Sequence, residues 1–260
     1  GSFTKTQTVT FTYGATYGLK ITTAAAGAAN RVKWTTQPVV KIVDQDDNVV
    51  TGGTDASQLV TISVDSGTLS GGYSINAASG TATFVDAALT DTAGNHTLTY
   101  TIASPSTKTI TQSLSLTFGP LDHLTVDTAA AGAVNNTVFS TMPIIKAYDY
   151  SNNLITNQTG SITVTASVLA GTGRVANFSN GVADFTGSGM KFLGTVGTYT
   201  VTYTLTSTTT KVTQSLALTP GTPTQLAMKT QPSSGAARKV LTTQPEVYVQ
   251  DVSGNTVTDS

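Results

Sequence analysis

Hydrophobic and polar residues alternate along most of this chain, and no segment has a sustained apolar period of 3.6 residues. Such alternation predicts half-buried strands, whereas the longer period would predict amphipathic helices. In the first half we expect strands at 19–23, 38–44, 59–65, 81–86, 95–103 and 108–118, with a short one near 73–76. In the second half we expect them at 124–128, 143–149, 161–168, 182–186, 198–206 and 211–218. The pattern therefore predicts an all-β fold.

One stretch, PVVKIVDQDDNVVT at 38–51, returns as PIIKAYDYSNNLIT at 143–156 and as PEVYVQDVSGNTVT at 245–258. Each copy is an alternating run that stops at an Asp, followed by a polar turn with an Asn and a second short run. This pattern predicts a strand, a turn and the beginning of another strand. The repeats open at Leu19, Leu124 and Leu226, and a spacing of about 100 residues is typical of an immunoglobulin-like (Ig-like) sandwich.

The ends of the chain fit the same repeat. The alternating run that contains Gln7 recurs around Gln112 and Gln214, each time just before a new repeat opens. Gly1 and Ser2 are typical of a cloning scar. The predicted domains are the last strand of a preceding Ig-like domain at 1–18, Ig-like domains at 19–121 and 122–223, and the N-terminal part of a third at 224–260. Short Gly/Pro junctions at 118–120 and 220–223 predict stiff connections.

Composition narrows the range of partners. The net charge is −1 and only 10% of the residues are charged, so we expect no nucleic-acid partner. The absence of Cys excludes disulfides and thiolate metal sites. No apolar run is long enough to span a bilayer, so these residues are not expected to insert into a membrane. Thr is far more frequent than usual, and its β-branched side chain favours strands.

Several motifs recur in the same order within the repeats. Asp44, Asn48, Val50 and Thr51 are followed by LVTISV at 59–64, GTATF at 80–84 and AGNHTLTY at 93–100, and the second repeat has NGVADF at 180–185 and VGTYTV at 196–201. This order resembles bacterial Ig-like repeats of the invasin/intimin type, which occur in tandem in large surface adhesins and some surface-layer proteins. The resemblance implies Greek-key sandwiches of about seven strands each, located outside the cell at its surface.

The resemblance also implies a structural role, as a rigid spacer or array-forming module of a surface layer or an adhesin stalk. The partners are then neighbouring repeats or copies of the same protein. Two alternatives stay open. One is a ligand- or carbohydrate-binding module, for which Tyr73, Tyr148, Tyr150 and Tyr248 are the candidate contacts. The other is a set of accessory domains of a secreted enzyme.

Catalytic chemistry has little support in the sequence. His96 and His123 are the candidate bases, but the slot of His96 holds Tyr199 in the next repeat, and the slot of His123 holds Gly18 and Gln225. The chain has no nucleophile elbow, zinc-protease motif or phosphate loop. We therefore predict no catalytic residues and no enzymatic activity. The slot of Tyr199 and His96 is expected to be an Ig-type corner, where a Tyr hydroxyl bonds the backbone.

A calcium site is the one cofactor that the sequence leaves open. The weak candidate ligands are Asp44, Asp46 and Asp47 at one turn, and Asp86 and Asp91 at another. Calcium needs several converging oxygen ligands, which clustered loop carboxylates can supply. The alternative is that Asp44 and its copies cap the turn through a side-chain oxygen. The other repeats have only Asp149 or Asp251 at this turn, which favours capping.

Core and rim positions complete the sequence picture. Trp34 shares its slot with Phe139 and Leu241, so it is expected to fill the core of its repeat. The Gln residues at 7, 112 and 214 lie on the core-facing side of their strands. A Gln turned inward needs partners, and we expect backbone hydrogen bonds at the rim of the sandwich rather than an intramolecular ester bond.

The third repeat lacks its later strands. Residues 226–260 would then expose an unpaired edge. They are expected either to be disordered or to be completed by the N-terminal strand of a neighbouring molecule, which would give head-to-tail chains.

Overall fold

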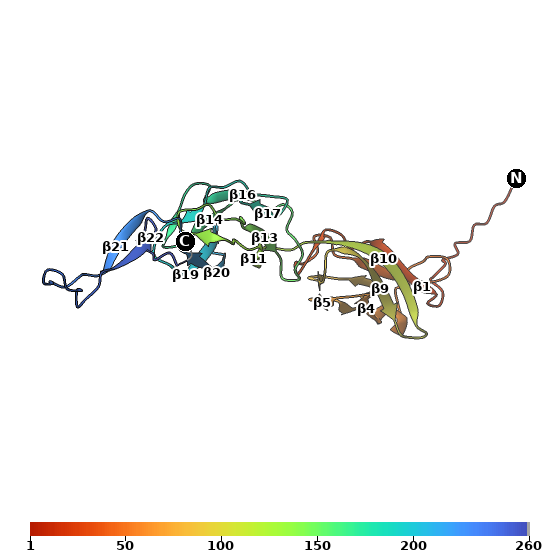
Figure 1. Cartoon of the computed structure of the whole chain (residues 1–260). Coiled ribbons are helices and arrows are strands. Elements are labelled where there is room, and N and C mark those ends of the chain that lie inside the picture. Colours follow the sequence, from red (N-terminus) through yellow and green to blue (C-terminus); the bar gives the residue numbers. More distant parts are fainter. Residues whose placement is uncertain (259–260) are drawn as a thin grey trace. The chain divides into compact units, whose positions relative to one another are not determined.

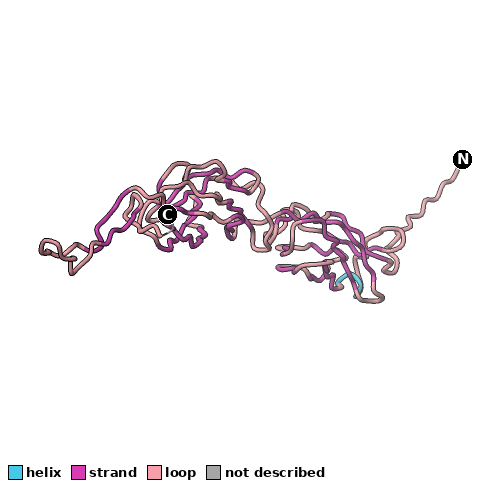
Figure 2. Tube along the Cα trace, viewed as in Figure 1, coloured by secondary structure: helices cyan, strands magenta, loops and turns pink. Residues whose placement is uncertain are grey.

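The structure is a computed structural model that describes residues 1–258. Strands form nearly all of its regular structure, and the one helical element among these residues is the short 3₁₀ turn η1 (Thr54–Ser57) (Figure 2). The all-β prediction is therefore confirmed. The chain forms two compact units, one made of Gly1–Pro120 with Asp149–Asn153, the other of Leu121–Tyr148 with the chain from Leu154 onward. The predicted domain limits stay predictions.

The first unit is a sandwich of two main sheets (Figure 1). One sheet has the order β1 (Gly18–Thr23), β3 (Val39–Val43) and β7 (Thr81–Thr83). The other has the order β2 (Ala28–Ala29), β10 (Lys108–Thr117), β9 (Gly94–Ile102), β4 (Leu59–Val64) and β6 (Ser74–Asn76). A separate hairpin joins β5 (Thr68–Ser70) to β8 (Ala88–Thr90). Strand β2 runs parallel to β10, and the other pairs are antiparallel.

The second unit repeats this topology, except that its two sheets are joined through β16 (Val175–Ser179). Its strands follow the order β11 (His123–Thr128), β13 (Ile144–Tyr148), β17 (Val182–Asp184), β16, β14 (Ser161–Thr165), β19 (Gly197–Leu205), β20 (Lys211–Thr219) and β12 (Ala133–Val134). Because β16 pairs with both β14 and β17, the two sheets of the sandwich are joined into one. Two-stranded pairs link β15 (Leu169–Ala170) to β18 (Lys191–Phe192) and β21 (Gln225–Thr230) to β22 (Glu246–Gln250).

Each sandwich buries the apolar half of its alternating strands. On β9, Leu98, Tyr100 and Ile102 are fully buried, while the two Thr residues between them are half-buried. Trp34 is fully buried in the first core and Phe139 is 4% exposed in the second, which confirms the predicted core position. Burial of such side chains stabilises each unit by about 1.5–3 kcal/mol per large apolar residue.

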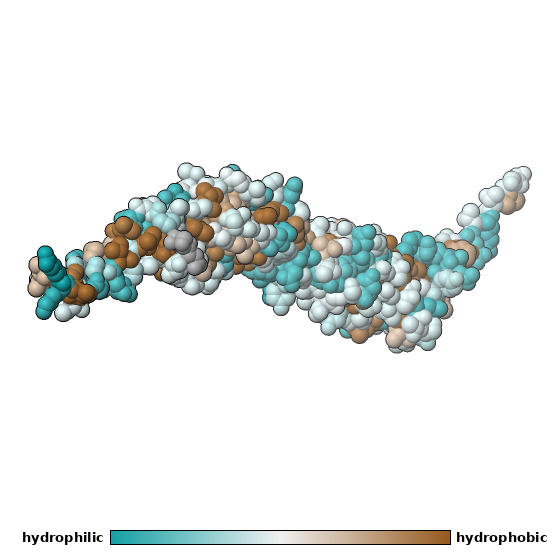
Figure 3. Space-filling model, in the orientation of Figure 1, coloured by the Kyte–Doolittle hydropathy of each residue, from teal (hydrophilic) through white to brown (hydrophobic). Residues whose placement is uncertain are grey.

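Two segments differ from the complete repeats. Residues 3–13 form no strand within the described chain, because none of its residues pairs with them and a strand requires a partner. Their assignment to the last strand of a preceding domain stays a prediction. In the third repeat, β21 and β22 form a two-stranded ribbon whose apolar residues are exposed (Figure 3). Leu226 is 72% exposed, whereas its counterpart Leu124 is 5% exposed.

Candidate functional site: the Asp–Asn loops

Each copy of the repeated stretch contains a loop that begins with Asp and ends with Asn. We call Asp44–Asn48, Asp149–Asn153 and Asp251–Asn255 the Asp–Asn loops. In the second of them, Asp149 Oδ1 accepts hydrogen bonds from the backbone N–H groups of Ser151 (2.9 Å) and Asn153 (2.9 Å). Asn152 has a positive φ of 60°, a conformation that Asn tolerates better than most residues. The Asp side chain therefore caps its own turn, as the sequence predicted.

The other carboxylate oxygen of Asp149 binds residues from the preceding repeat. Asp149 Oδ2 accepts a hydrogen bond from Asn30 Nδ2 (2.9 Å) and another from Gly119 N (2.7 Å). A third comes from Asn153 Nδ2 (3.0 Å). Asp149 is 1% exposed, and all of these residues belong to the first compact unit. The loop is thus part of the first unit, although β13 directly before it belongs to the second.

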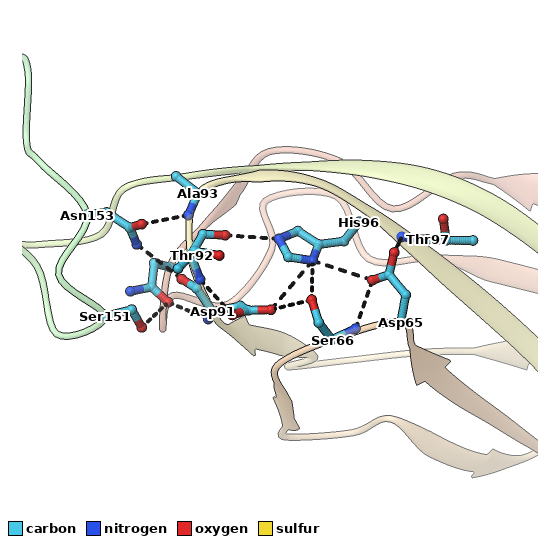
Figure 4. Close-up of polar contacts among 10 residues, drawn as sticks. Asp65, Ser66, Asp91, Thr92, Ala93, His96, Thr97, Ser151 and Asn153 are labelled. Carbon is cyan, nitrogen blue, oxygen red and sulfur yellow. Dashed lines mark hydrogen bonds and ion pairs between the residues drawn. The ribbon is translucent and has the colours of Figure 1, made fainter.

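Asn153 extends this network to the segment before β9 (Figure 4). Ala93 N donates to Asn153 Oδ1 (2.6 Å), and Asn153 Nδ2 donates to the carbonyl oxygen of Asp91 (3.1 Å). Asp91 N in turn donates to Asn30 Oδ1 (3.0 Å). Both ends of the Asn30 amide are therefore used, one by the loop and one by its own repeat.

An exposed contact flanks these buried hydrogen bonds. The guanidinium carbon of Arg31 lies 4.1 Å from the centroid of the Tyr150 ring, within the first unit. A cation over an aromatic face at an exposed site is worth about 0.5–1 kcal/mol. This pair adds to the contact of the loop with the first repeat, but it contributes less than the buried hydrogen bonds.

The second unit contains the same arrangement around Asp251. Asp251 Oδ2 accepts hydrogen bonds from Asn135 Nδ2 (2.8 Å) and Gly221 N (2.8 Å). Val196 N donates to Asn255 Oδ1 (2.8 Å), while Asn255 Nδ2 donates to the Gly194 carbonyl (2.9 Å). The third Asp–Asn loop therefore binds the second repeat in the way that the second loop binds the first.

The Asp44–Asn48 loop has the hydrogen bonds within its turn and the one from the junction glycine, but none like those of Asn30 and the 91–93 segment to the second loop. Asp44 Oδ1 accepts from the N–H groups of Asp46 (3.0 Å) and Asn48 (2.9 Å), and Oδ2 accepts from Gly14 N (2.7 Å). Gly14 thus takes the position that Gly119 holds against Asp149. Asn48 is exposed, and no residue within 1–258 donates to it from a preceding repeat.

The electrostatics of the loops favour ionised carboxylates. Burial raises the pKa of Asp149, but the hydrogen bonds from Gly119, Asn153 and Asn30 outweigh burial and hold that pKa below its ordinary value. The pKa of Asp251 is lowered in the same way, against the effect of burial. For Asp44, the hydrogen bond from Gly14 is the largest cause of a lowered pKa.

Close backbone approach explains the glycine at each junction. A Cβ at Gly119 would collide with the backbone carbonyl oxygen of Asn30, and a Cβ at Gly221 would collide with that of Asn135. At Gly14 the nearest atom would be Asp44 Oδ2 at 3.5 Å, an ordinary contact. The two occupied junctions therefore require glycine sterically, whereas Gly14 has room for a side chain.

His96 supports the segment that binds Asn153 (Figure 4). Its Nε2 donates to the Thr92 carbonyl (3.0 Å), and its Nδ1 lies 3.3 Å from Ser66 Oγ. The Asp65 and Asp91 carboxylates are 3.5 and 3.7 Å from Nδ1. Ser66 Oγ makes its shorter hydrogen bond to Asp91 (2.6 Å), and this bond is the largest cause of the lowered pKa of Asp91. His96 thus links the Thr92 carbonyl to the contact between Ser66 and Asp91.

The corner predicted from the sequence is present in the second repeat. Tyr199 OH donates to the Thr195 carbonyl at 2.6 Å, four residues earlier in the chain. His96 makes the equivalent bond to Thr92, also four residues earlier. The two side chains therefore fill one structural role, and His123 lies elsewhere, 2.9 Å from Asp122.

The five candidate calcium ligands do not converge on one site. Asp47 pairs with Lys20 (2.7 Å) and Asp86 with Lys33 (2.6 Å). Asp44 is used in its turn, Asp91 bonds Ser66, and Asp46 is exposed. Over residues 1–258, no three His, Cys, Asp or Glu side chains form a group that could hold a metal ion. The structure does not bring these carboxylates together.

Two of the three Gln residues, Gln112 and Gln214, bond the backbone at the rim, as predicted. Gln112 Oε1 accepts from Ala25 N (3.0 Å), and its Nε2 donates to the Ala25 carbonyl (3.0 Å). Tyr100 OH also donates to Gln112 Oε1 (2.8 Å). Gln214 makes the same three contacts with Ala130 and Tyr203, at 2.8–2.9 Å. Gln7 is exposed.

Sequence reasoning missed the asparagines that bind the loops. Asn30 and Asn135 occupy corresponding slots, in GAAN and GAVN, and both are buried at 1% and 2% exposure. The recurrence of Gly-Ala-x-Asn in both complete repeats was the signal available in the sequence. The third repeat has Ala237 in this slot.

Within residues 1–258, no helix has the length and hydrophobicity that crossing a membrane requires.

No family model matches the chain, and no curated protein matches it. Similar solved structures do exist. The D0–D1 region of intimin is 16% identical, covering 76% of this chain and 98% of that chain, with a TM-score of 0.28.

Invasin, described as a bacterial integrin-binding protein, is 15% identical, with 92% of this chain and 48% of invasin covered and a TM-score of 0.39. Domains 4 and 5 of the S-layer protein SbsC are 14% identical, with coverages of 79% and 99% and a TM-score of 0.33. A β-glucuronidase of glycoside hydrolase family 2 is 13% identical, with coverages of 78% and 20% and a TM-score of 0.34. The chain is thus similar to Ig-like domains of surface adhesins and S-layer proteins, at scores that carry no conclusion about activity.

Proposed function

We propose that this chain is a non-enzymatic structural segment of a cell-surface protein, in which Ig-like repeats are held in series by the Asp–Asn loops. The observation that carries the proposal is the position of Asp149–Asn153. Tyr148 and Leu154 on either side belong to the second unit, but the loop itself is part of the first. The second unit is therefore connected to the first both by the chain at Pro120 and by this loop.

The chemistry of the loop makes the connection costly to open. Withdrawing the loop would remove the hydrogen bonds of Asn30, Gly119 and Ala93 to its side chains. Hydrogen bonds to a charged group contribute about 1.5–3 kcal/mol each. A buried donor left without a partner costs a similar amount. Two connections between consecutive repeats suit a spacer.

The same loop chemistry at Asp251 supports a serial role. A device that served a single binding event would be needed once, whereas this one recurs at each junction of the repeat. Stability in such arrays comes from each unit together with its contacts to the next. A location outside the cell and assembly with neighbouring repeats are part of this proposal.

The alternatives from the sequence stay predictions. Tyr150 is 55% exposed and Tyr73 is 42% exposed, as a binding module would need. The ring of Tyr150, however, lies within the second Asp–Asn loop and is already covered by the guanidinium of Arg31. The two histidines bond Thr92 and Asp122 locally, which favours a non-enzymatic role.

Distance measurements between spin labels test the proposal directly. Because the chain has no Cys, labels can be placed only at introduced sites, and Ser113→Cys on β10 and Ser215→Cys on β20 are exposed equivalents. We expect a narrow distance distribution that broadens with Asp149→Ala. Asp251→Ala is the matched control, because it breaks the same loop in the second unit and should leave the distribution unchanged. A distribution that is broad in the parent, or unaffected by Asp149→Ala, would refute the proposal.

A further inference from the structure

We propose that residues 3–14 and the Asp44–Asn48 loop together form a docking surface for an Ig-like repeat that lacks its own last strand. The inference rests on the proposed function, because it extends the Asp–Asn loop contact to a further repeat. Two separate features of the first unit lead to the same partner. One is a strand sequence without a sheet, and the other is an Asp–Asn loop that lacks the contacts its two copies make with a preceding repeat.

Residues 3–13 have the sequence of a last strand. Gln7 and the alternating residues after it match Gln112 on β10, the last strand of the first repeat. On β10 the two apolar residues that follow Gln112 are each 2% exposed, whereas Val9 is 64% exposed and Phe11 is 91% exposed. The segment therefore presents an apolar face and an unpaired backbone of the kind that elsewhere completes a sandwich.

The Asp44–Asn48 loop is ready for the same contact that its two copies make. Its inner hydrogen bonds are formed, and Gly14 already donates to Asp44 Oδ2. Asn48 is exposed, while its counterparts Asn153 and Asn255 are 9% and 4% exposed because a preceding repeat covers them. The difference lies in what covers the loop and not in the loop itself.

A hollow of about 640 Å³ lies between the two features. It is lined by Phe11, Gly14, Asp44, Asp46 and Asn48, among other residues. Both parts of the docking surface thus border one space. A partner that fills this space can reach the strand and the loop together.

The chemistry of the surface specifies its partner. Asp44 Oδ2 accepts from Gly14 and Asn48 but lacks a third donor like the Asn30 amide on Asp149. The Asn48 side chain lacks a backbone N–H and a carbonyl, and Val9 and Phe11 lack an apolar sheet with a free edge. Residues 19–106 of this chain supply all of these groups through Asn30, through the 91–93 segment and through β9. A free sugar or a small peptide could meet the hydrogen-bonding needs of the loop, but not the sheet that residues 3–13 require.

A tandem fusion tests the inference on the full chain. A copy of residues 19–106 is placed directly before Ser2, which puts Gln7 and Gly14 in the register of Gln112 and Gly119. We expect amide hydrogen exchange of residues 7–12 to slow by about 100-fold or more, to the level of β10 in the same molecule. The Asn48 N–H and side-chain amide should become protected as well.

Two variants of the fusion separate the strand from the loop. In the fusion, Val9→Ser with Phe11→Ser should abolish protection of residues 7–12. In the unfused chain these side chains are exposed, so the same double substitution should leave the stability of the first unit unchanged. Asn30→Ala in the added copy should leave the strand protected and speed exchange around Asn48.

A second fusion controls for folding of the added copy. It carries residues 19–119 before Ala15, so the copy keeps its own β10. If this copy folds and the 19–106 copy does not, residues 3–13 cannot serve as a last strand and the proposal is overturned. Unchanged fast exchange at 7–12 and at Asn48 also overturns it, as does failure of both fusions, because the surface then holds no repeat. None of these outcomes depends on Asp149, so the proposed function is tested independently.

Discussion

The hydrogen bond between Asn30 and Asp149 can be measured by a double-mutant cycle of Asn30→Ala and Asp149→Asn. Asp149 accepts five hydrogen bonds, three on Oδ2 and two on Oδ1. An Asn at 149 replaces one of these oxygens by an NH₂ group, so at least two donors lose their acceptor. Asn30→Ala removes one donor to the carboxylate and also leaves Asp91 N without its acceptor.

The expected free energies follow from this count. At about 1.5–3 kcal/mol for each of two hydrogen bonds to a charged group, Asp149→Asn should destabilise the first unit by about 3–6 kcal/mol. Asn30→Ala should cost about 2–4 kcal/mol. The double variant should cost less than the sum, with a coupling of about 1.5–3 kcal/mol between the two positions.

Trp34 provides an assay that is specific for the first unit. It is the only Trp in the chain and is fully buried in the core of that unit. Its fluorescence during urea unfolding reports on the first unit alone. With a denaturant slope of about 2 kcal/mol/M, Asp149→Asn should lower the urea midpoint by about 2 M.

The matched control is Asp251→Asn, which removes the same interactions from the second unit. It should leave the Trp34 midpoint in place. A coupling below about 0.5 kcal/mol would show that the Asn30–Asp149 hydrogen bond contributes no more than independent sites do. Equal shifts for Asp149→Asn and Asp251→Asn would contradict the assignment of the second loop to the first unit.

The remaining predictions use the same fluorescence transition. The folded-state pKa of Asp149 lies below its ordinary value near 3.9. The stability that its carboxylate adds to the first unit is therefore complete above about pH 4 and is lost as the pH falls through the folded pKa. Below about pH 4 the unsubstituted chain should lose more stability than the Asp149→Asn variant. Gly119→Ala should destabilise by about 1–3 kcal/mol through collision with Asn30, whereas Gly14→Ala should leave the midpoint unchanged, and equal effects would refute the steric argument. Gln112→Ala should lower the free energy of unfolding by about 2–4 kcal/mol, because it removes the hydrogen bonds to Ala25 and Tyr100, while Gln7→Ala should be neutral. Separately, an intact mass equal to that of the unmodified chain would exclude an ester bond.

The long strands could be predicted because they bury every second side chain. On β9 and β19 the alternation runs through nine residues, which identifies the buried face. Short strands such as β2 and β12 have two residues each and carry no such pattern. They exist because an adjacent long strand, β10 or β20, offers a parallel ladder. Residues 3–13 show the converse, since a strand pattern without a partner forms no strand.

The sequence predicts the turn in each Asp–Asn loop but not the contact of the loop with the preceding repeat. Asp44, Asp149 and Asp251 were identified as turn residues, because capping depends on neighbours within four positions. Their binding of a preceding repeat depends on Asn30, which lies 119 residues from Asp149. Local pattern contains no information on such a contact. Comparison of the copies could have paired Asn30 with Asn135, but it could not have shown which side chain each of them faces.

The use of a carboxylate in this contact is itself informative. An apolar side chain in place of Asp149 would still be buried by the first repeat, but it would tolerate small shifts of the loop. An ionised carboxylate satisfied by five N–H donors does not, because any shift leaves buried charge without a partner. We infer that the Asp fixes the register of each loop on its repeat. By this reasoning Ala237, which stands in the slot of Asn30, would leave a loop that docked on the third repeat without its amide donor, and hence with a less strictly defined register.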